Sequence, residues 1–572
     1  MFYLTRESLP IFLPLGFIGV YRWFWFFVKI LAYVLYKPRK PRRHPRYVPS
    51  RDVTILVPTI DSGDEIRLAV RTWLKCDPFE IIFITTPVAE AALEKLAREV
   101  DPLYQKIRVV TIKKPNKRNQ MVAGINHVKT AITVFCDDDV LWPETMLKWM
   151  LAPFEDKLMG GVGTSQKVLS IHKRMTVWEI LAAFRISLRN IEITATTYID
   201  GGVCCLSGRT AAYRSCMLRD PDFQWAFTHE YWRGKYHQHS GDDKFLTRWV
   251  HSHNWRTYIQ ACPEAELSST FKDNWRFLKQ LLRWTRNTWR SDFRSLFTER
   301  YVWHRHPFVA FTMLDKFFNP ITLLAGPATV IWVLVRAPTH GELDHWVIAT
   351  SYVVWLFITR LIKYMPHFVR RPQDVLFIPV WLVFNIYFAI MKVYCLFTLH
   401  VTDWGTRDGA DASKGDDDDM DIFRPKWNED WESKIAEQSP HVVIAVAAED
   451  EKALSTGQQL SAPAAAHTRS SPAKHEKKRP RDKPWLHDTS FSSSESSDHS
   501  INLSIMSDYS PTTLKSDDSY DSQKTIAMSD GMGAGEEAGR SHGEIGSPCR
   551  QANRNSLWSI EPVTPSKNGA RA

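Results

Sequence analysis

Short apolar runs alternate with segments of helical spacing from Asp52 to about Pro263. The runs "VTILVPTI", "EIIFITT" and "AITVFC" predict buried strands, and the stretches between them predict helices: "DEIRLAVRTWLKC", "AEAALEKLAREV" and "NQMVAGINHVKT". Strands that alternate with helices are typical of a parallel sheet covered on both faces. The pattern therefore predicts an α/β domain over residues 50–270, with ligands bound at the carboxyl ends of its strands.

Longer apolar runs flank this domain. Residues 9–36, 308–336 and 346–364 each predict a transmembrane helix, since about 20 apolar residues cross a bilayer core of about 30 Å. For the first run, a buried helix of a soluble domain is the alternative. The basic stretch "KPRKPRRHPR" that follows it favours a cytosolic continuation. Residues 375–399 carry Asn385, Lys392 and many aromatic side chains, which fit an interfacial or re-entrant helix as well as a span.

The composition narrows the classes of partner. A chain of 572 residues is too long for one core, and its net charge of +10 would suit a nucleic-acid binder. The basic residues lie beside apolar runs, however, so we expect the lipid bilayer as partner and no nucleic acid. Residues 408–572 are charged, Ser-rich and of low complexity, which predicts a disordered cytosolic tail. Its serines are candidate targets of regulatory kinases.

Three consecutive carboxylates, Asp137, Asp138 and Asp139, follow the third strand run. Like charges at the end of a buried strand need a positive partner. Because successive strand side chains point to opposite faces, Asp137 and Asp139 share one face. Two carboxylates placed in this way suit a hard divalent cation that also binds substrate phosphates. An acidic loop or a helix N-terminus is the alternative interpretation.

Two further motifs carry candidate chemistry. In "SGDDKFLTRW", Asp243 opens an apparent helix and is a candidate general base, although Asp242 or Asp243 would also serve as a helix cap. In the amphipathic segment 271–300, Gln280, Arg283 and Trp284 fall on one helical face. Arginine grips a diphosphate through two hydrogen bonds, and tryptophan stacks on a sugar ring. A basic, aromatic helix at the bilayer surface is the alternative.

The order of these motifs carries more information than any one of them. A strand with DxD, then GDD, QxxRW, apolar helices and "DWGTR" (403–407) resembles the processive family 2 glycosyltransferases, which include hyaluronan, chitin and cellulose synthases. "KPNKRNQM" and "CCLSGRTAAYR" match as well. The chain is most similar to the fungal type 2 glycosyltransferases related to hyaluronan and capsular polysaccharide synthases. The resemblance covers about residues 50–407 and implies an α/β GT-A, Rossmann-like domain on the cytosolic side of the membrane.

The resemblance also implies roles for individual residues. Asp137 and Asp139 would hold Mg²⁺ or Mn²⁺ against the diphosphate of a UDP-sugar, and Asp243 would take the proton from the acceptor hydroxyl. Contacts to the nucleotide or the sugars would come from the remaining matched positions, Lys117, Arg118, Gln280, Arg283, Trp284, Trp404, Arg407, Pro58 and Thr59. The segment 403–407 would close over the nucleotide.

One position departs from the family pattern. The second strand run ends with Thr85 and Thr86, where the family has an aspartate that binds uridine, and Asp61 is a candidate to compensate. The sequence therefore supports the identity of the nucleotide less strongly than it supports the metal site.

These observations predict a membrane-bound, inverting and processive β-glycosyltransferase. It would polymerise sugar from a UDP-sugar donor onto a growing polysaccharide outside the cell or in the cell wall, and so support fungal surface or hyphal growth. The expected location is the plasma membrane or secretory vesicles. The alternative is a catalytically degenerate membrane scaffold of the same fold, which recruits partners through its tail. A small-solute transporter fits the sequence poorly, because the spans are few, no internal repeat is visible and the large α/β domain would be unexplained.

Overall fold

The computed structural model describes residues 9–402 apart from 61–62, 64, 104, 114–115, 171, 173 and 337–344. The side chains of residues 9–15, 336, 345 and 348 are likewise outside the description. Asp61, Trp404, Arg407 and the predicted tail 408–572 therefore lie outside the described residues.

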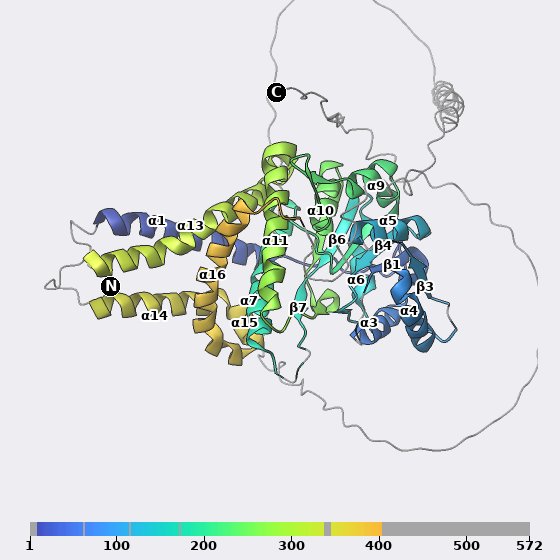
Figure 1. Ribbon diagram of the computed structural model, residues 1–572, viewed down its shortest axis with the longest axis horizontal. Coiled ribbons are helices and arrows are strands. Elements are labelled where there is room, and N and C mark those ends of the chain that lie inside the picture. Colours follow the sequence, from blue (N-terminus) through green and yellow to red (C-terminus); the bar gives the residue numbers. More distant parts are fainter. Residues whose placement is uncertain are drawn as a thin grey trace, which may run out of the picture. The chain divides into compact units, whose positions relative to one another are not determined.

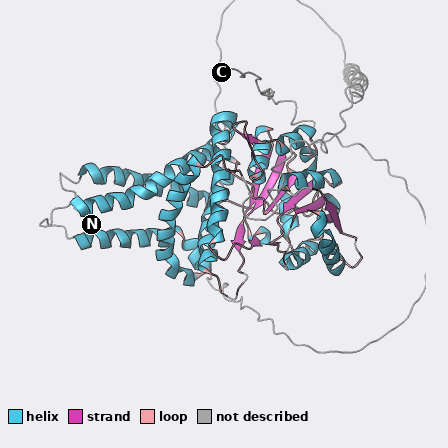
Figure 2. Cartoon of the chain, viewed as in Figure 1, coloured by secondary structure: helices cyan, strands magenta, loops and turns pink. Residues whose placement is uncertain are grey.

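A seven-stranded mixed sheet forms the centre of the α/β domain (Figures 1 and 2). Its order is β11-β6-β8-β4-β1-β2-β3. The strands are β1 (Val53–Pro58), β2 (Glu80–Thr85), β3 (Ile107–Thr111), β4 (Ile132–Cys136), β6 (Met159–Thr164), β8 (Thr210–Arg214) and β11 (Arg256–Gln260).

The expectation of a purely parallel sheet is wrong for one strand. β8 runs antiparallel to both β4 and β6. The reason is local: the chain leaves α7 (Val177–Asp200) and reaches the sheet beside the carboxyl end of β4, so β8 begins where β4 ends. The other pairs, β1 with β2 and β4, β2 with β3, and β6 with β11, are parallel as predicted.

Apolar side chains fill both faces of the sheet. On β1, Val53, Ile55 and Val57 belong to one core cluster and Leu56 to the other, and all four are fully buried. The burial of such a branched side chain stabilises the fold by about 2 kcal/mol. Helices cover both sides: α3 (Glu65–Lys75), α4 (Pro87–Val100) and α6 (Met146–Leu151) with the first cluster, and α5 (Lys117–His127), α9 (Pro221–Thr228) and α10 (Asp242–Ser252) with the second.

Two smaller sheets complete the domain. β5 (Val140–Leu141) pairs antiparallel with β12 (Leu267–Ser269), which pairs parallel with β7 (Gln166–Val168). β9 (Tyr231–Trp232) and β10 (Tyr236–His237) form a short antiparallel pair. The remaining short helices are α2 (Pro49–Asp52), α8 (Ser215–Leu218), α12 (Tyr301–Arg305) and α15 (Met365–Arg370).

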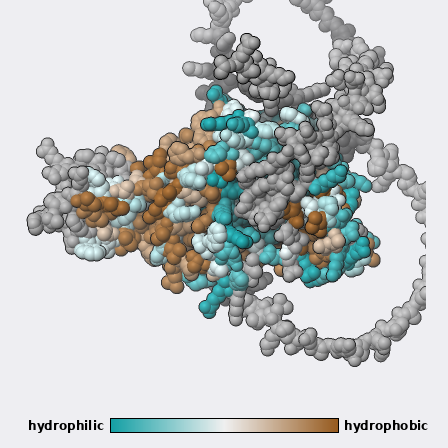
Figure 3. Space-filling view, in the orientation of Figure 1, coloured by the Kyte–Doolittle hydropathy of each residue, from teal (hydrophilic) through white to brown (hydrophobic). Residues whose placement is uncertain are grey.

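Three helical segments in the described residues are long and apolar enough to cross a membrane. They are Gly16–Leu35 in α1 (Leu9–Leu35), Pro307–Val335 in α13 (Pro307–Arg336), and Pro372–Phe397, which ends in α16 (Ile378–Phe397). α14 (His345–Lys363), predicted as a span, is not among them and carries Arg360 and Lys363 in its last turn. Figure 1 shows α1, α13 and α14 projecting together from the α/β domain, and Figure 3 shows hydrophobic surface on this side.

α16 runs across the bases of the projecting helices and beside α11 (Arg276–Phe293), as Figure 1 shows. The indole Nε1 of Trp289 on α11 donates to the carbonyl oxygen of Lys392 on α16, at 3.1 Å. Arg290 Nη1 donates to the carbonyl oxygen of Leu399, just beyond α16, at 2.9 Å. α11 then continues into a π-helical turn at Arg294–Glu299. The helix that carries QxxRW is therefore packed directly against an apolar helix.

A half-buried carboxylate attaches the projecting helices to the α/β domain. Glu192 on α7 lies 3.8 Å from Lys29 Nζ on α1 and 3.2 Å from Lys316 Nζ on α13. The three side chains are between 18% and 26% exposed, so water screens this cluster only in part. α1 and α13 are thus joined to the domain through one shared anion.

Candidate functional site

The register between β4 and β8 places Arg209 opposite the first of the three carboxylates. Cys136, the last residue of β4, pairs with Thr210, so Asp137, which follows β4, faces the residue that precedes β8. The amide nitrogen of Asp137 donates to the carbonyl oxygen of Arg209, at 3.1 Å. Antiparallel pairing thus brings a basic side chain to the acidic end of β4.

A second antiparallel pairing fixes Asp139. Val140 pairs with Ser269, so Thr270 follows opposite Asp139, and its Oγ1 donates to Asp139 Oδ2 at 2.7 Å. Burial raises the pKa of Asp139 to about 6, and Arg209 and the Thr270 hydroxyl offset this only in part. Added positive charge would therefore stabilise the ionised form of this carboxyl group.

Asp138 is the least solvent-exposed of the three carboxylates, at 7%. Its Oδ2 accepts a hydrogen bond from Thr59 Oγ1 at 2.6 Å, directly beyond the end of β1. Pro58 is the last residue of β1 and is buried, and Gln120 Nε2 donates to the carbonyl oxygen of Thr59 at 3.0 Å. The structure thus places Pro58 and Thr59 beside the carboxylates, with the Thr59 hydroxyl holding Asp138.

Lys117 joins the DxD segment to the GDD segment. Its Nζ lies 3.0 Å from Asp137 Oδ1 and 3.2 Å from Asp242 Oδ2. Burial would lower the pKa of Lys117, but Asp137 and Asp242 outweigh it and hold this pKa above its ordinary value. Gly208 lies against the same pair, since a methyl group there would be 3.5 Å from Asp242 Oδ2 and 3.7 Å from Lys117 Nζ. The predicted nucleotide-binding lysine therefore lies inside the acidic site.

The two aspartates of GDD occupy different environments at the start of α10. Asp242 is buried and paired, and although burial would raise its pKa, Lys117 and Arg118 hold the pKa below its ordinary value. Asp243 is only partly buried, and its Oδ1 accepts from the amide of Lys244 at 2.8 Å. Within the part of the chain that the structure describes, Asp243 forms no ion pair. Gly241 caps the helix with φ +84°, so neither aspartate is the N-cap.

α11 brings Trp284 of the QxxRW motif to this site. Gln280 and Trp284 are one helical turn apart, with Arg283 between them, and all three are partly buried. The Oε1 atom of Gln280 is buried and accepts no hydrogen bond from any described residue. The guanidinium carbon of Arg209 lies 5.3 Å from the centre of the Trp284 ring. Arg209 therefore links Trp284 to the end of β4.

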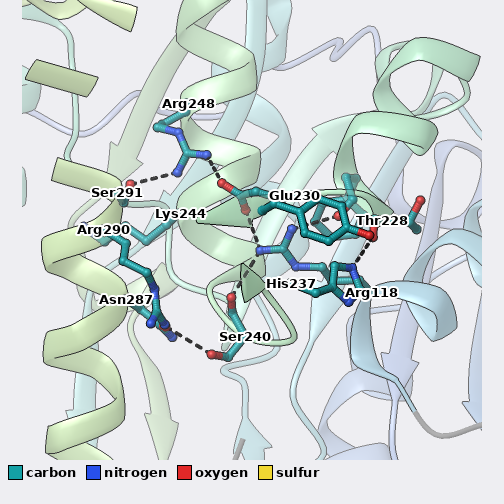
Figure 4. A network of polar contacts seen from close by, with 12 residues as sticks. Arg118, Thr228, Glu230, His237, Ser240, Lys244, Arg248, Asn287, Arg290 and Ser291 are labelled. Atoms are coloured by element: carbon teal, nitrogen blue, oxygen red, sulfur yellow. Dashed lines mark hydrogen bonds and ion pairs between the residues drawn. The ribbon is translucent and has the colours of Figure 1, made fainter. Parts of the chain in front are cut away.

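Arg118, predicted to contact the nucleotide, lies elsewhere. It is 1% exposed, its Nη2 donates to Glu230 Oε2 at 2.7 Å, and its Nη1 donates to the carbonyl oxygen of Phe227 at 2.8 Å. Figure 4 shows the guanidinium groups of Arg118 and Arg248 directed at Glu230. Its position supports a structural role for Arg118 rather than contact with a nucleotide.

Glu230 ties together the elements that carry the site. It pairs with Arg118 on α5, Arg248 on α10 and Arg294 just after α11. Burial would raise the pKa of Glu230, but the three guanidinium groups outweigh it and lower the pKa to about 2. Arg118 Nη2 also donates to the carbonyl oxygen of Ser240, at 3.2 Å. One buried carboxylate thus positions the start of α5, the GDD turn and the QxxRW helix.

We expect Glu230→Gln to lower the free energy of unfolding by about 3–5 kcal/mol, because it leaves three guanidinium groups without a buried anion. Thermal unfolding of the full chain in detergent measures this. Since the folded-state pKa is depressed, the stabilisation is present above about pH 4.5 and is lost as the pH falls towards 2. Glu94→Gln is the control, because Glu94 lies on the exposed side of α4 and, among the described residues, pairs only with Arg98. Equal midpoints for the two variants would contradict the positioning role.

Sequence reasoning missed several residues of this site. Arg209, Thr270 and Glu230 are far from one another in the chain, and none belongs to the DxD, GDD or QxxRW spacing. Arg209 lies in the matched stretch "CCLSGRTAAYR" and immediately precedes the strand "TAAY", but nothing in the sequence was a reason to assign it a role. Finding its partner required the direction of β8, which the sequence pattern did not predict.

Comparison with known proteins defines the class of this site. The family described as "Glycosyltransferase like family 2" matches residues 49–287, a range that includes the carboxylates, Lys117, Arg209 and the QxxRW helix. The mixed sheet, with the acidic motif at the end of β4, is a GT-A-like glycosyltransferase fold. The protein is therefore a glycosyltransferase.

Curated relatives define the family more closely. A "Type 2 glycosyltransferase" of Zymoseptoria tritici is 40% identical over 414 residues, covering 69% of this chain and 86% of the relative. One of Gibberella zeae is 38% identical over 421 residues, covering 72% and 78%. An NDP-glycosyltransferase of Aspergillus luteorubrus, ltbB, is 31% identical over 400 residues, covering 65% and 92%. The chain belongs to the type 2 glycosyltransferases.

The likeness to solved structures is remote. The mannosyltransferase PcManGT from Pyrobaculum calidifontis, in complex with GDP-Man and Mn²⁺, shares 16% identity with a TM-score of 0.46, covering 67% of this chain and 99% of that one. This likeness supports no conclusion about substrate or metal.

Proposed function

We propose that this enzyme is an inverting, processive glycosyltransferase that transfers sugar from a UDP-sugar to a growing polysaccharide at a membrane. The observation that carries the proposal is the meeting of three motifs in one site. Asp137 and Asp139 follow β4, Asp243 is the second residue of α10, and Trp284 lies on α11. Lys117 and Arg209 bridge them.

The carboxylate pair fits a divalent cation such as Mg²⁺ or Mn²⁺. Asp137 and Asp139 each have one oxygen engaged, by Lys117 and Thr270 respectively, and no described residue hydrogen-bonds to the other oxygen. The described residues contain no group of three or more His, Cys, Asp or Glu that could hold a metal. An ion held by Asp137 and Asp139 would thus take further oxygen ligands from the donor's phosphates and water, as Mg²⁺ commonly does. When bound, it would stabilise the charge that develops on the leaving diphosphate.

The remaining steps fall to the protein's own groups. In a single displacement, the acceptor oxygen bonds to the anomeric carbon as the bond to the diphosphate breaks, and the hydroxyl proton passes to Asp243. Attack from the side opposite the leaving group inverts an α-linked donor to a β-linkage. The unpaired Oε1 of Gln280 is suited to accept a hydrogen bond from an acceptor hydroxyl. The role of Trp284 in this scheme is to border the acceptor sugar.

The attached apolar helices support processivity, because a polymer held beside the site can be extended without release. In this scheme α1 and α13 cross the plasma membrane or the membrane of secretory vesicles, and α14, which is less apolar but projects beside them (Figure 1), returns the chain to the cytosolic side, where the α/β domain lies. α16 lies at the interface, consistent with its packing along α11. The product would be a fungal extracellular or cell-wall polysaccharide.

Metal removal and a survey of donors test the proposal. Purified full-length protein is incubated with UDP-glucose, UDP-N-acetylglucosamine or UDP-glucuronate and with Mn²⁺ or Mg²⁺, and released UDP is measured. We expect turnover with at least one donor, near-complete loss after chelation, and recovery when metal is restored. Turnover that survives chelation would contradict the metal assignment. If none of the three donors gave UDP release, the UDP-sugar assignment would be contradicted.

One observation favours a non-catalytic alternative. Thr85 ends β2, where the resemblance leads us to expect a uridine-binding aspartate, and its buried Oγ1 has no hydrogen-bond partner among the described residues. A scaffold that no longer binds nucleotide would tolerate this change. The complementation assay described in the Discussion separates the two functions.

A further inference from the structure

Arg209 is held by two aromatic rings in the middle of the site. Its guanidinium carbon lies 4.1 Å from the centre of the Phe271 ring and 5.3 Å from that of Trp284. The two rings meet edge to face, with their centres 6.2 Å apart. Phe271 directly follows Thr270, which binds Asp139. The guanidinium group is therefore fixed between the carboxylate pair and the QxxRW helix.

The guanidinium nitrogens of Arg209 have no partner of their own. Among the described residues, they form neither a hydrogen bond nor an ion pair. Asp139 and Asp137 act on Arg209 electrostatically, but the direct cation of Asp137 is Lys117, at 3.0 Å. A partly buried cation whose donors are unpaired destabilises the fold unless an anion binds to it.

A structural counter-ion role for Arg209 fits this geometry poorly. A counter-ion for the carboxylates would approach one of them as closely as Lys117 does. Arg209 instead lies against two rings, which hold a planar guanidinium in a fixed orientation. A planar fork with both edges unpaired matches the oxygen geometry of a phosphate, to which it donates two parallel hydrogen bonds. Its position beside the proposed metal ligands is where the phosphates of the donor would lie.

We propose that Arg209 is a substrate-binding residue that donates hydrogen bonds to the diphosphate of the sugar-nucleotide. The inference rests on the proposed function, because it takes the donor to be a nucleoside diphosphate sugar. Trp284 then has a second role beside the one predicted from sequence, since its ring supports the arginine. The diphosphate would lie between the cation held by Asp137 and Asp139 and the fixed guanidinium group.

Equilibrium binding of UDP and of uridine to the full-length protein, both with Mn²⁺, tests this proposal. For Arg209→Gln we expect the Kd for UDP to rise on the order of ten-fold to a hundred-fold, because charge-assisted hydrogen bonds are lost, while the Kd for uridine stays unchanged. Arg209→Lys keeps the charge but loses the planar fork, so its Kd for UDP should lie between those of the wild type and Arg209→Gln. Arg98→Gln removes one exposed positive charge on α4 and is the control for net charge.

Three outcomes would overturn the proposal. The first is an unchanged Kd for UDP in Arg209→Gln. This holds even if that variant binds UDP-glucuronate more weakly, because the partner of Arg209 would then be the carboxylate of the sugar. Equal weakening of UDP and uridine would assign Arg209 to the support of the fold. Thermal unfolding shows whether Arg209→Gln fails to fold, and in that case Arg209→Lys alone tests the proposal. The third outcome is a Kd for UDP in Arg209→Lys that equals the wild-type Kd.

Failure of the proposed nucleotide is distinguishable from failure of this inference. If the wild-type protein does not bind UDP, the UDP assignment fails, and inorganic pyrophosphate with Mn²⁺ becomes the probe for Arg209. Pyrophosphate binding that is weakened in Arg209→Gln but not in Arg98→Gln would still support a diphosphate contact. Equal pyrophosphate binding by wild type and Arg209→Gln would overturn it.

Discussion

Asp139→Asn should abolish sugar transfer while the chain remains folded and inserted in the membrane. Asparagine keeps the size of the side chain, and its amide oxygen can still accept the hydrogen bond from Thr270. The negative charge that would hold the cation is lost, and the metal contributes several kcal/mol of transition-state stabilisation. At 1.36 kcal/mol for each ten-fold change, UDP release should fall on the order of a thousand-fold or more. The assay is UDP release by membranes that contain equal amounts of each protein.

Two comparisons make this result interpretable. Glu94→Gln removes one carboxylate on the exposed side of α4 and should release UDP at the wild-type rate. Near-wild-type turnover by Asp139→Asn would refute the metal pair. In a strain that lacks the protein, rescue by wild type but not by Asp139→Asn supports an enzyme, whereas full rescue by both would favour the scaffold.

Asp243→Asn should produce the second large loss, and the loss should lie in kcat. A positioned general base contributes about 10²- to 10⁴-fold to the rate, and an amide cannot accept the proton. Because Asp243 is partly exposed and forms no ion pair among the described residues, its replacement leaves the polar network of the site in place. We therefore expect the KM for the donor and the binding of UDP to change little. Initial rates over a range of donor concentrations separate the two parameters.

Asp242→Asn provides the matched comparison at the neighbouring position. Asp242 shares Lys117 with Asp137, so its loss should weaken stability and donor binding together with turnover. A lower kcat with unchanged stability for Asp243→Asn, and a lower stability for Asp242→Asn, would support the different roles of the two residues. If Asp242→Asn lowered kcat alone and Asp243→Asn had no effect, the base would have been assigned to the wrong residue.

Local patterns predicted the parts of the site that lie at strand ends. The apolar runs 53–58, 80–85 and 132–136 are strands, and the three aspartates follow the last of them. The burial of Asp138 alone, with Asp137 and Asp139 less enclosed, agrees with alternation along an extended chain. These features depend only on neighbours in sequence, which is why they could be predicted.

Contacts between distant segments could not be predicted in this way. β8 is buried along its whole length, like the parallel strands β1 and β4, and only the path of the chain after α7 reverses its direction. The pairing that brings Arg209 to Asp137 depends on that reversal. The family resemblance assigned Arg118 to the nucleotide together with Lys117, but the rotation between consecutive helical residues directs Arg118 to Glu230 instead.

The apolar helices illustrate a different limit. Hydropathy measures how apolar a segment is, and it does not distinguish lipid from protein as the surroundings. Residues 372–397 meet the length and composition of a span, yet Trp381, Phe384 and Phe388 on α16 pack in one cluster with α7 and α11. Whether this segment crosses the bilayer is a question of packing, and an accessibility assay on single cysteines introduced along α16 would answer it.

The shared carboxylate of Glu192 and the seam between α11 and α16 have a consequence for biogenesis. A catalytic fragment cut out at residues 49–300 would leave Glu192 without both of its lysines and would expose the apolar side of α11. We expect such a fragment to aggregate rather than turn over sugar. Competence would then begin only after translocon-dependent insertion, so that a mistargeted chain would not consume nucleotide sugars in the cytosol.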